Sequence, residues 1–209
     1  MLVILPGVGR PASMLAFWAD LLPQPVEALD YPRIPTLHGL IDHFEGRLDP
    51  ETLVVGESLG GQVALGLAGR GFRAMAFDPP LTMAKQWAVQ YAVRTTLAAY
   101  GPNHAAHAMA ESIFGVMPDG RQEERIYYHL LDALPHRTTI VTGDVPLWPY
   151  RVAFGRACSI DEADRYVIAC KANVEFRQIA GPHALLTESV EASRAEILRW
   201  LGANKDHQG

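Results

Sequence analysis

Short apolar runs rich in β-branched residues alternate with longer stretches in which apolar residues recur at every third or fourth position. Runs of roughly four to eight apolar residues bounded by turn residues are typical of buried strands, and the longer spacing is typical of helices. The pattern predicts strands at residues 2–5, 26–29, 53–55, 74–77, 139–142 and 174–179. Because helical patterns separate the first four strands, we expect an α/β fold with a mostly parallel sheet of about six strands.

Apolar spacing and capping residues together predict the helices. The expected helices cover residues 11–22, 37–48, 59–69, 162–171 and 190–201. Thr36 precedes the second of these and can cap it through its hydroxyl. The stretch Ser159-Ile160-Asp161-Glu162 has the form of a capping box, so we expect it to open the fourth.

Residues 81–134 interrupt the alternation with helical patterns alone. Pro102 and the turn Pro118-Asp119-Gly120 divide this stretch into about three helices. The last of them would carry Ile126, Tyr127, Leu130, Leu131 and Leu134 on one face. We therefore expect a single domain over 1–209 with a helical insertion at about 81–135.

Composition limits the classes of function. The chain has 209 residues, of which 49% are hydrophobic and 20% charged, as in a globular enzyme. Its net charge of -5 disfavours nucleic acid and anionic membranes as partners. Its two cysteines lack a metal-binding spacing and fit a reduced compartment, and no apolar run approaches the roughly 20 residues of a membrane span. We expect a cytoplasmic protein.

One short segment carries a chemical signature. Gly56-Glu57-Ser58-Leu59-Gly60 follows a predicted strand and opens a predicted helix. A serine on such a tight turn is exposed to reactants, and only small residues fit two positions to either side. The helix that begins there directs its unpaired N–H groups toward an oxygen that becomes negative during acyl transfer.

This segment resembles the nucleophile elbow of the α/β-hydrolase superfamily. The resemblance implies a three-layer α/β-hydrolase fold in which the insertion forms a lid over the serine. Only six strands are predicted where the superfamily usually has eight. We therefore expect the usual N-terminal hairpin of that fold to be missing, which would leave the strand at 26–29 as an edge.

The resemblance also implies a set of catalytic residues. Ser58 would be the nucleophile, and His183, which follows the last predicted strand in Gly181-Pro182-His183, would be its base. The carboxylate that orients the histidine has two main candidates, and another carboxylate such as Asp161, or none at all, is the remaining alternative. Asp144 follows the strand at 139–142 and is preferred slightly, although it lies closer to Gly143 than is usual, and Asp78 ends the strand at 74–77.

An oxyanion hole requires two backbone N–H groups directed at one point. Leu59, directly after the nucleophile, would supply one, and the resemblance points to Val8 for the other. We expect no cofactor. His104 and His107 lie three positions apart on a predicted helix, but they lack a third ligand nearby and are expected to be solvated rather than to bind a metal.

These residues favour a serine hydrolase that acts on a small ester, thioester or related acyl compound, as a monomer or homo-oligomer. Two alternatives remain. A relative of the same fold could bind a small molecule without catalysis. A nicotinamide-dependent oxidoreductase is suggested by Gly7-Val8-Gly9-Arg10-Pro11-Ala12, with Asp30 after the next strand, although Pro11 removes an N–H that a pyrophosphate would need.

Overall fold

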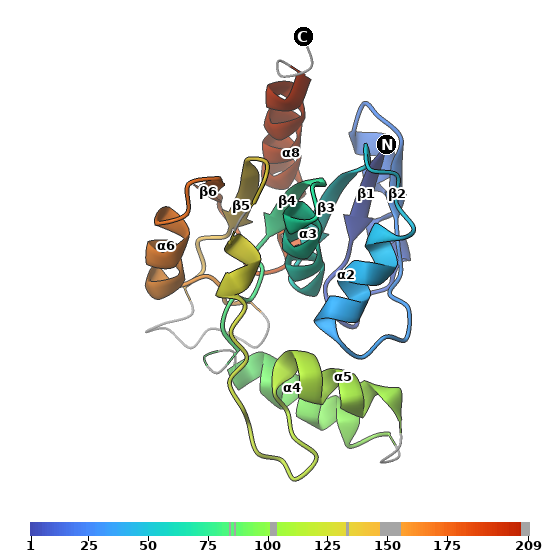
Figure 1. The fold of residues 1–209 in the computed structure, drawn as a ribbon, viewed down its shortest axis with the longest axis vertical. Helices are drawn as coiled ribbons and strands as arrows, with labels where there is room; N and C mark the ends of the chain where they lie inside the picture. The colour runs from blue at the N-terminus through green and yellow to red at the C-terminus, as the bar shows by residue number, and fades with distance from the viewer. Residues whose placement is uncertain (84, 86, 101–103, 133, 147–155, 206–209) are drawn as a thin grey trace.

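A six-stranded parallel sheet forms the centre of the protein, as a computed structural model shows (Figure 1). The structure describes residues 1–83, 85, 87–100, 104–132, 134–146 and 156–205. The strand order is β2-β1-β3-β4-β5-β6, and every neighbouring pair is parallel. The strands are β1 (Leu2–Leu5), β2 (Val26–Ala28), β3 (Leu53–Glu57), β4 (Arg73–Phe77), β5 (Thr138–Thr142) and β6 (Val174–Gln178). The predicted α/β fold with six strands is confirmed.

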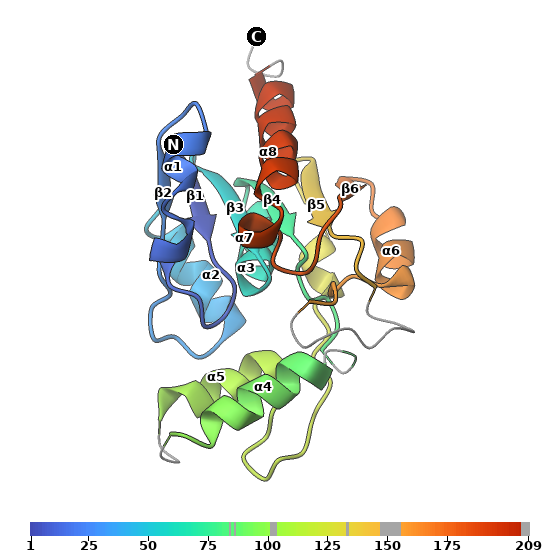
Figure 2. The same ribbon diagram turned by 180° about the vertical axis from the view of Figure 1, so that it is seen from behind.

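Helices cover both faces of the sheet. The helices of the described residues are η1 (Ala12–Leu15), α1 (Trp18–Leu21), α2 (Leu37–Glu45), α3 (Leu59–Gly69), α4 (Trp87–Leu97), α5 (Ala105–Phe114), η2 (Tyr128–Leu131), α6 (Glu162–Ala169), α7 (Leu185–Glu188) and α8 (Val190–Lys205). Figure 1 shows α2 and α3 in front of the sheet, and Figure 2 shows α1, α7 and α8 on the other face. None of the helices in these described ranges is both long and apolar enough to cross a bilayer.

Side chains of the strands alternate between two hydrophobic cores. Val3 and Leu5 of β1 pack with α2 and α3, whereas Leu2 and Ile4 pack with α1 and α8. Successive side chains of a strand point to opposite faces, so a sheet covered on both sides needs apolar residues at every position. This requirement explains why β1, which is buried at all four positions, reads as a continuous apolar run.

The strand β2 lies at the outer edge of the sheet and pairs only with β1 among the described residues. It is three residues long, with Val26 and Ala28 partly buried and Glu27 exposed. A short edge strand with an outward charge is poorly suited to pairing with another chain.

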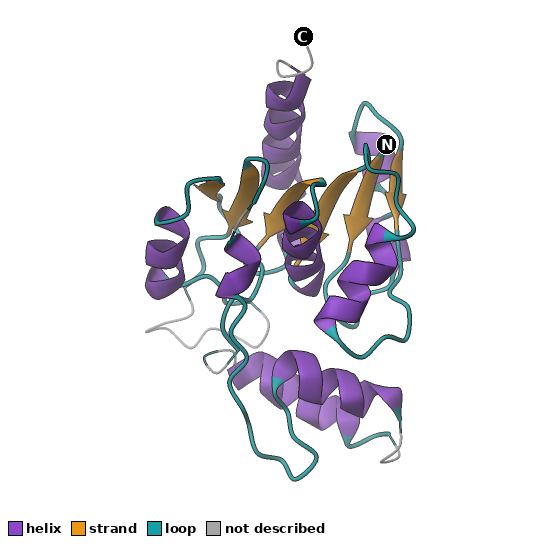
Figure 3. Ribbon diagram, in the orientation of Figure 1, coloured by secondary structure: helices purple, strands orange, loops and turns teal. Residues whose placement is uncertain are grey.

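The insertion contains α4 and α5, which lie side by side beyond the carboxyl ends of the strands (Figures 1 and 3). The prediction of a third helix there is wrong, because among the described residues from 121 to 134 only the four residues of η2 are helical. Residues 126 and 127 instead return along the segment after β4. Ile126 pairs with Thr82, and the N–H of Tyr127 donates to the carbonyl of Leu81 at 2.8 Å. These bonds satisfy the backbone without a helix, and Ile126 is left 56% exposed.

Two other helix predictions need correction. The helix expected at 11–22 is divided into η1 and α1, each four residues long. The helix α6 begins at Glu162 with Asp161, not Ser159, as its N-cap. Asp161 and Asp164 exchange the two hydrogen bonds of a capping box, which frees Ser159 for other contacts.

Candidate active site

Ser58 lies between β3 and α3 in a backbone conformation that few residues adopt, with φ 56° and ψ -116°. The flanking glycines show why the turn requires them. A Cβ on Gly56 would lie 1.9 Å from the carbonyl oxygen of Gly60, and one on Gly60 would lie 2.2 Å from the carbonyl oxygen of Leu5. Both contacts involve backbone that cannot move aside, so the sharp turn depends on these two residues.

The two segments that carry the predicted oxyanion donors lie next to Ser58. The helix α3 begins at Leu59, and its first hydrogen bond runs from the N–H of Gln62 to the carbonyl of Ser58, so the N–H of Leu59 precedes the helical ladder. Gly7 lies on the other side, where an added Cβ would be 3.3 Å from the Cβ of Ser58. Val8 follows Gly7 directly and is partly buried.

Asp78 and His183 form a buried pair. Asp78 ends β4 with a positive φ of 42° and is 0% exposed, and its Oδ2 lies 2.5 Å from Nδ1 of His183. Nδ1 donates in this pair because an ionised carboxylate can only accept. The other ring nitrogen, Nε2, is then available to accept a proton.

Asp78 accepts further hydrogen bonds that hold it in place. The hydroxyl of Thr142 donates to Oδ1 at 2.6 Å, and the N–H of Ser159 donates to Oδ2 at 2.6 Å. The N–H of Ile160 adds a longer bond of 3.3 Å to Oδ1. The hydroxyl of Ser159 also lies 3.3 Å from Nδ1 of His183. Sequence reasoning missed Thr142 and Ser159, because nothing in the local pattern distinguishes Ser159 from a helix cap.

Asp144 makes a different set of contacts. It is exposed, its Oδ1 accepts the N–H of Gly181 at 2.9 Å, and its own N–H donates to the carbonyl of Gly181 at 3.0 Å. A Cβ on Gly143 would lie 2.0 Å from that same carbonyl oxygen. Asp144 therefore anchors the backbone that leads into His183, whereas Asp78 contacts the imidazole itself.

The environment of His183 favours its charged form. Burial alone would lower the pKa of His183, but the hydrogen bond and the negative charge of Asp78 outweigh it, with a further contribution from Glu57. Arg10 opposes this effect, and the net result is a pKa raised above the usual value. An imidazole that gains a proton readily is suited to act as a base.

Ser58 and His183 lie at the same end of the sheet. Ser58 follows β3, and the turn after His183 is bound to the residue before Ser58, because the N–H of Leu186 donates to Oε2 of Glu57 at 2.7 Å. Among the residues that the structure describes, no hydrogen bond joins the Ser58 hydroxyl to His183. Such bonds are often long in unliganded hydrolytic sites and tighten when substrate binds.

Two of the residues considered for cofactors and metals, Asp30 and His104, accept backbone hydrogen bonds, whereas His107 is partly buried rather than solvated and its Nε2 has no hydrogen-bond partner among the described residues. Asp30 accepts the N–H of Ala12 at 2.7 Å and so caps η1, which is too short to offer the helix N-terminus of a dinucleotide site. His104 caps α5 by accepting the N–H of Ala106 at 3.2 Å. Within the described ranges, no group of three His, Cys, Asp or Glu side chains is placed to hold a metal ion.

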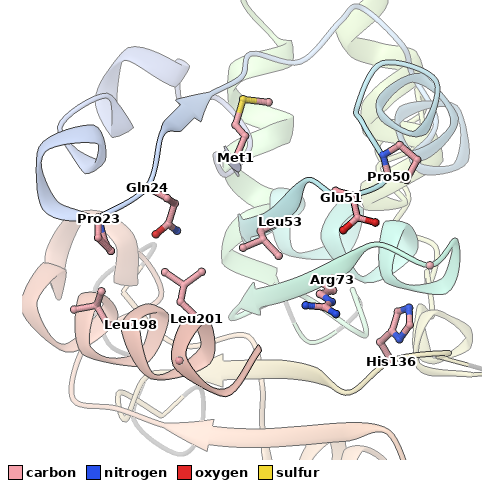
Figure 4. A pocket seen from close by; sticks show the side chains of 12 residues that line it. Met1, Pro23, Gln24, Pro50, Glu51, Leu53, Arg73, His136, Leu198 and Leu201 are labelled. Carbon is pink, nitrogen blue, oxygen red and sulfur yellow. The ribbon is translucent and has the colours of Figure 1, made fainter. Parts of the chain in front are cut away.

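A cavity of about 560 Å³ lies at the opposite end of the sheet (Figure 4). Leu53 and Arg73 begin β3 and β4, and both line it, together with Leu198 and Leu201 of α8. Because Ser58 and Asp78 follow the carboxyl ends of the same strands, the cavity is separated from them by the length of the sheet.

The sequence of the chain matches no family model and no curated protein. Its structure is similar to a thermophilic esterase from Thermogutta terrifontis, with 18% identity, a TM-score of 0.66 and coverage of 97% of this chain and 89% of the other. It is also similar to E-2-(acetamidomethylene)succinate hydrolase, at 13% identity and a TM-score of 0.68, covering 97% and 91%. The enol-lactonase from Burkholderia xenovorans LB400 is similar at 14% identity and a TM-score of 0.63, covering 96% and 91%.

Proposed function

Because the chain has the α/β-hydrolase fold, we propose that it is a serine hydrolase that cleaves small esters, thioesters or related acyl compounds. The buried pair of Asp78 and His183, at the strand ends that also carry the strained Ser58, is the observation that supports this proposal most strongly. The solved structures of similar fold include an esterase and a lactonase, which is consistent with chemistry at an acyl carbon.

The proposed reaction has two stages. In the first, Ser58 attacks the acyl carbon while Nε2 of His183 takes the hydroxyl proton, and the N–H groups of Leu59 and Val8 hold the oxyanion. His183 then gives the proton to the departing alcohol or thiol, and an ester of Ser58 remains. In the second stage, His183 takes a proton from water while the water oxygen attacks the acyl carbon, and it then gives that proton to the Ser58 oxygen as the ester bond breaks, so that the acid product leaves and both side chains return to their starting states. Asp78 stabilises the imidazolium in both stages.

The insertion around α4 and α5 is proposed as a lid. Both helices lie beyond the strand ends that carry Ser58, which is where a segment would cover the serine and select the acyl group (Figure 3). We place this insertion within a single domain. No cofactor takes part in the proposed reaction, and the partner is a small molecule.

A binding protein of the same fold is the second candidate. Ser58 and His183 share no hydrogen bond within the described residues, and a protein that only binds its ligand needs none. In that case the site would hold an acyl compound without cleaving it.

A fluorophosphonate probe separates the two candidates, because it labels only a serine that a base has activated. We expect the purified protein to be labelled and the Ser58→Ala variant to be unlabelled. Ser13→Ala, at an exposed position of η1, is the matched control and should label like the parent. Hydrolysis of p-nitrophenyl esters of increasing chain length would then define the acyl group. Folded parent protein that does not react would favour the binding protein.

A further inference from the structure

We propose that Glu57 is a positioning residue, whose carboxylate fixes the relative positions of the nucleophile, the oxyanion donor and the base. This inference rests on the proposed hydrolase function. Glu57 directly precedes Ser58, and its side chain is 1% exposed. The reaction itself does not use this carboxylate, so its burial calls for another explanation.

Both oxygens of Glu57 bind segments that carry the proposed chemistry. Oε1 accepts from Nη1 of Arg10 at 2.5 Å, and Oε2 accepts from the N–H of Leu186 at 2.7 Å. Arg10 comes two residues after Val8, and Leu186 comes three residues after His183. One side chain on β3 therefore links the loop that would hold the oxyanion to the turn that carries the base.

Arg10 strengthens this link from the other side. Its Nη1 also lies 3.4 Å from the hydroxyl of Thr187, which belongs to the same turn as Leu186. Gly7, in the loop that carries Arg10, lies close to this carboxylate, because a Cβ added to Gly7 would be 3.8 Å from Oε1 of Glu57. The guanidinium thus spans the gap between the two loops and closes the arrangement around Glu57.

The energetics argue against a purely stabilising role. Burial raises the pKa of Glu57, and Arg10 and the N–H of Leu186 only partly offset that effect. The Arg10 side chain is 28% exposed and that of Glu57 is 1% exposed, so the carboxylate bears most of the lost hydration. Such buried charges seldom contribute more stability than apolar residues of similar volume. The Glu57–Arg10 pair instead holds the two loops in one geometry and places charges near His183, which an apolar pair could not do.

Glu57 and Arg10 also act on the proton affinity of His183. The charged groups that face this imidazole are Asp78 from β4, Glu57 from β3 and Arg10 from the loop after β1. Glu57 raises the pKa of His183 and Arg10 lowers it. Since His183 must be neutral to accept a proton from Ser58, activity falls as the pH drops through this pKa. This fall is the acid limb of the pH–activity profile. Removing the charge of Glu57 should move the acid limb to lower pH, and removing the charge of Arg10 should move it to higher pH.

The test compares Glu57→Gln and Arg10→Gln with Glu51→Gln, a control at an exposed acid before β3. Hydrolysis of a p-nitrophenyl ester gives kcat and KM as a function of pH, and NMR titration of the His183 ring gives its pKa without requiring activity. We expect both site variants to lose about 10- to 100-fold in kcat, as displacements of about 1 Å do, with KM changed far less. We also expect their acid limbs to move in opposite directions. The double variant should lose less than the product of the single losses, because the two side chains act as a pair.

Each outcome is decisive. A loosened fold would move the acid limbs of both site variants in the same direction, and that result would overturn the proposal. Values of kcat within twofold of the parent would overturn it as well. Arg10→Lys keeps the charge and should restore the position of the limb. If the parent protein fails to label with the fluorophosphonate, the hydrolase assignment fails by itself. The ring titration then still decides whether Glu57 and Arg10 hold His183 as inferred, and unshifted titrations would refute it.

Discussion

Replacing Asp78 with asparagine removes one charge from the candidate site and leaves the shape of the side chain unchanged. The carboxylate accepts from Nδ1 of His183 and from Ser159 on one oxygen, and from Thr142 and Ile160 on the other. An amide nitrogen in place of Oδ2 would face two donors, Nδ1 of His183 at 2.5 Å and the N–H of Ser159 at 2.6 Å. In place of Oδ1 it would face the N–H of Ile160 at 3.3 Å and the hydroxyl of Thr142, which can turn. We therefore expect the amide oxygen to stay on the side of His183, with the charge lost.

The magnitude follows from that lost charge. Two opposite unit charges about 4 Å apart attract each other by about 4 kcal/mol at an effective dielectric constant of about 20. Each 1.36 kcal/mol of lost transition-state stabilisation is worth about tenfold in rate, so Asp78→Asn should lose about 10³ in turnover. A loss nearer 10⁴ would indicate that the amide has turned and forced the wrong tautomer on His183.

Asp144→Asn is the matched comparison. Its side chain is exposed, and an amide oxygen can still accept the N–H of Gly181. Such surface changes cost about 0.5 kcal/mol or less, so turnover should stay within about threefold of the parent. Steady-state hydrolysis of a p-nitrophenyl ester measures both variants, with circular dichroism to establish that each is folded. Equal losses in the two variants, or a mild loss in Asp78→Asn, would refute the assignment of Asp78 as the partner of His183.

Two further predictions concern stability and are read from urea unfolding. Gly60→Ala should lower the free energy of unfolding by about 3 kcal/mol or more, because the new Cβ would lie 2.2 Å from a backbone oxygen of β1. Gly69→Ala, where nothing lies within 4 Å, should instead be neutral or add up to about 1 kcal/mol, and similar losses at both glycines would contradict the steric argument. Lys85→Met should cost about 3 kcal/mol because it leaves the fully buried carboxylate of Asp164 without its cation. Adding Asp164→Asn should recover part of that loss, and an unchanged midpoint in the single variant would refute the coupling.

Much of the fold follows from short-range patterns in the sequence. All six strands form where short apolar runs predict them, and the central strand β1 is apolar throughout because helices cover both of its faces. The third helix of the insertion was predicted wrongly, because Ile126 and Tyr127 have helical spacing but bond to the segment at Leu81 and Thr82. Contacts between distant segments outweighed local preference there.

By itself the sequence determines that Ser58 follows a strand, in a turn that its flanking glycines make possible. A Cβ at Gly56 or Gly60 would clash with residues only a few positions away or on the adjacent strand. The sequence also determines that His183 follows the last strand. Only the tertiary structure decides which aspartate meets that imidazole. Asp78 and His183 are 105 positions apart, and they meet because β4, β5 and β6 are neighbours whose carboxyl ends point the same way. The same holds for Ser159 and Glu57, whose contacts depend on how distant loops pass one another, and no local pattern of residues encodes that path.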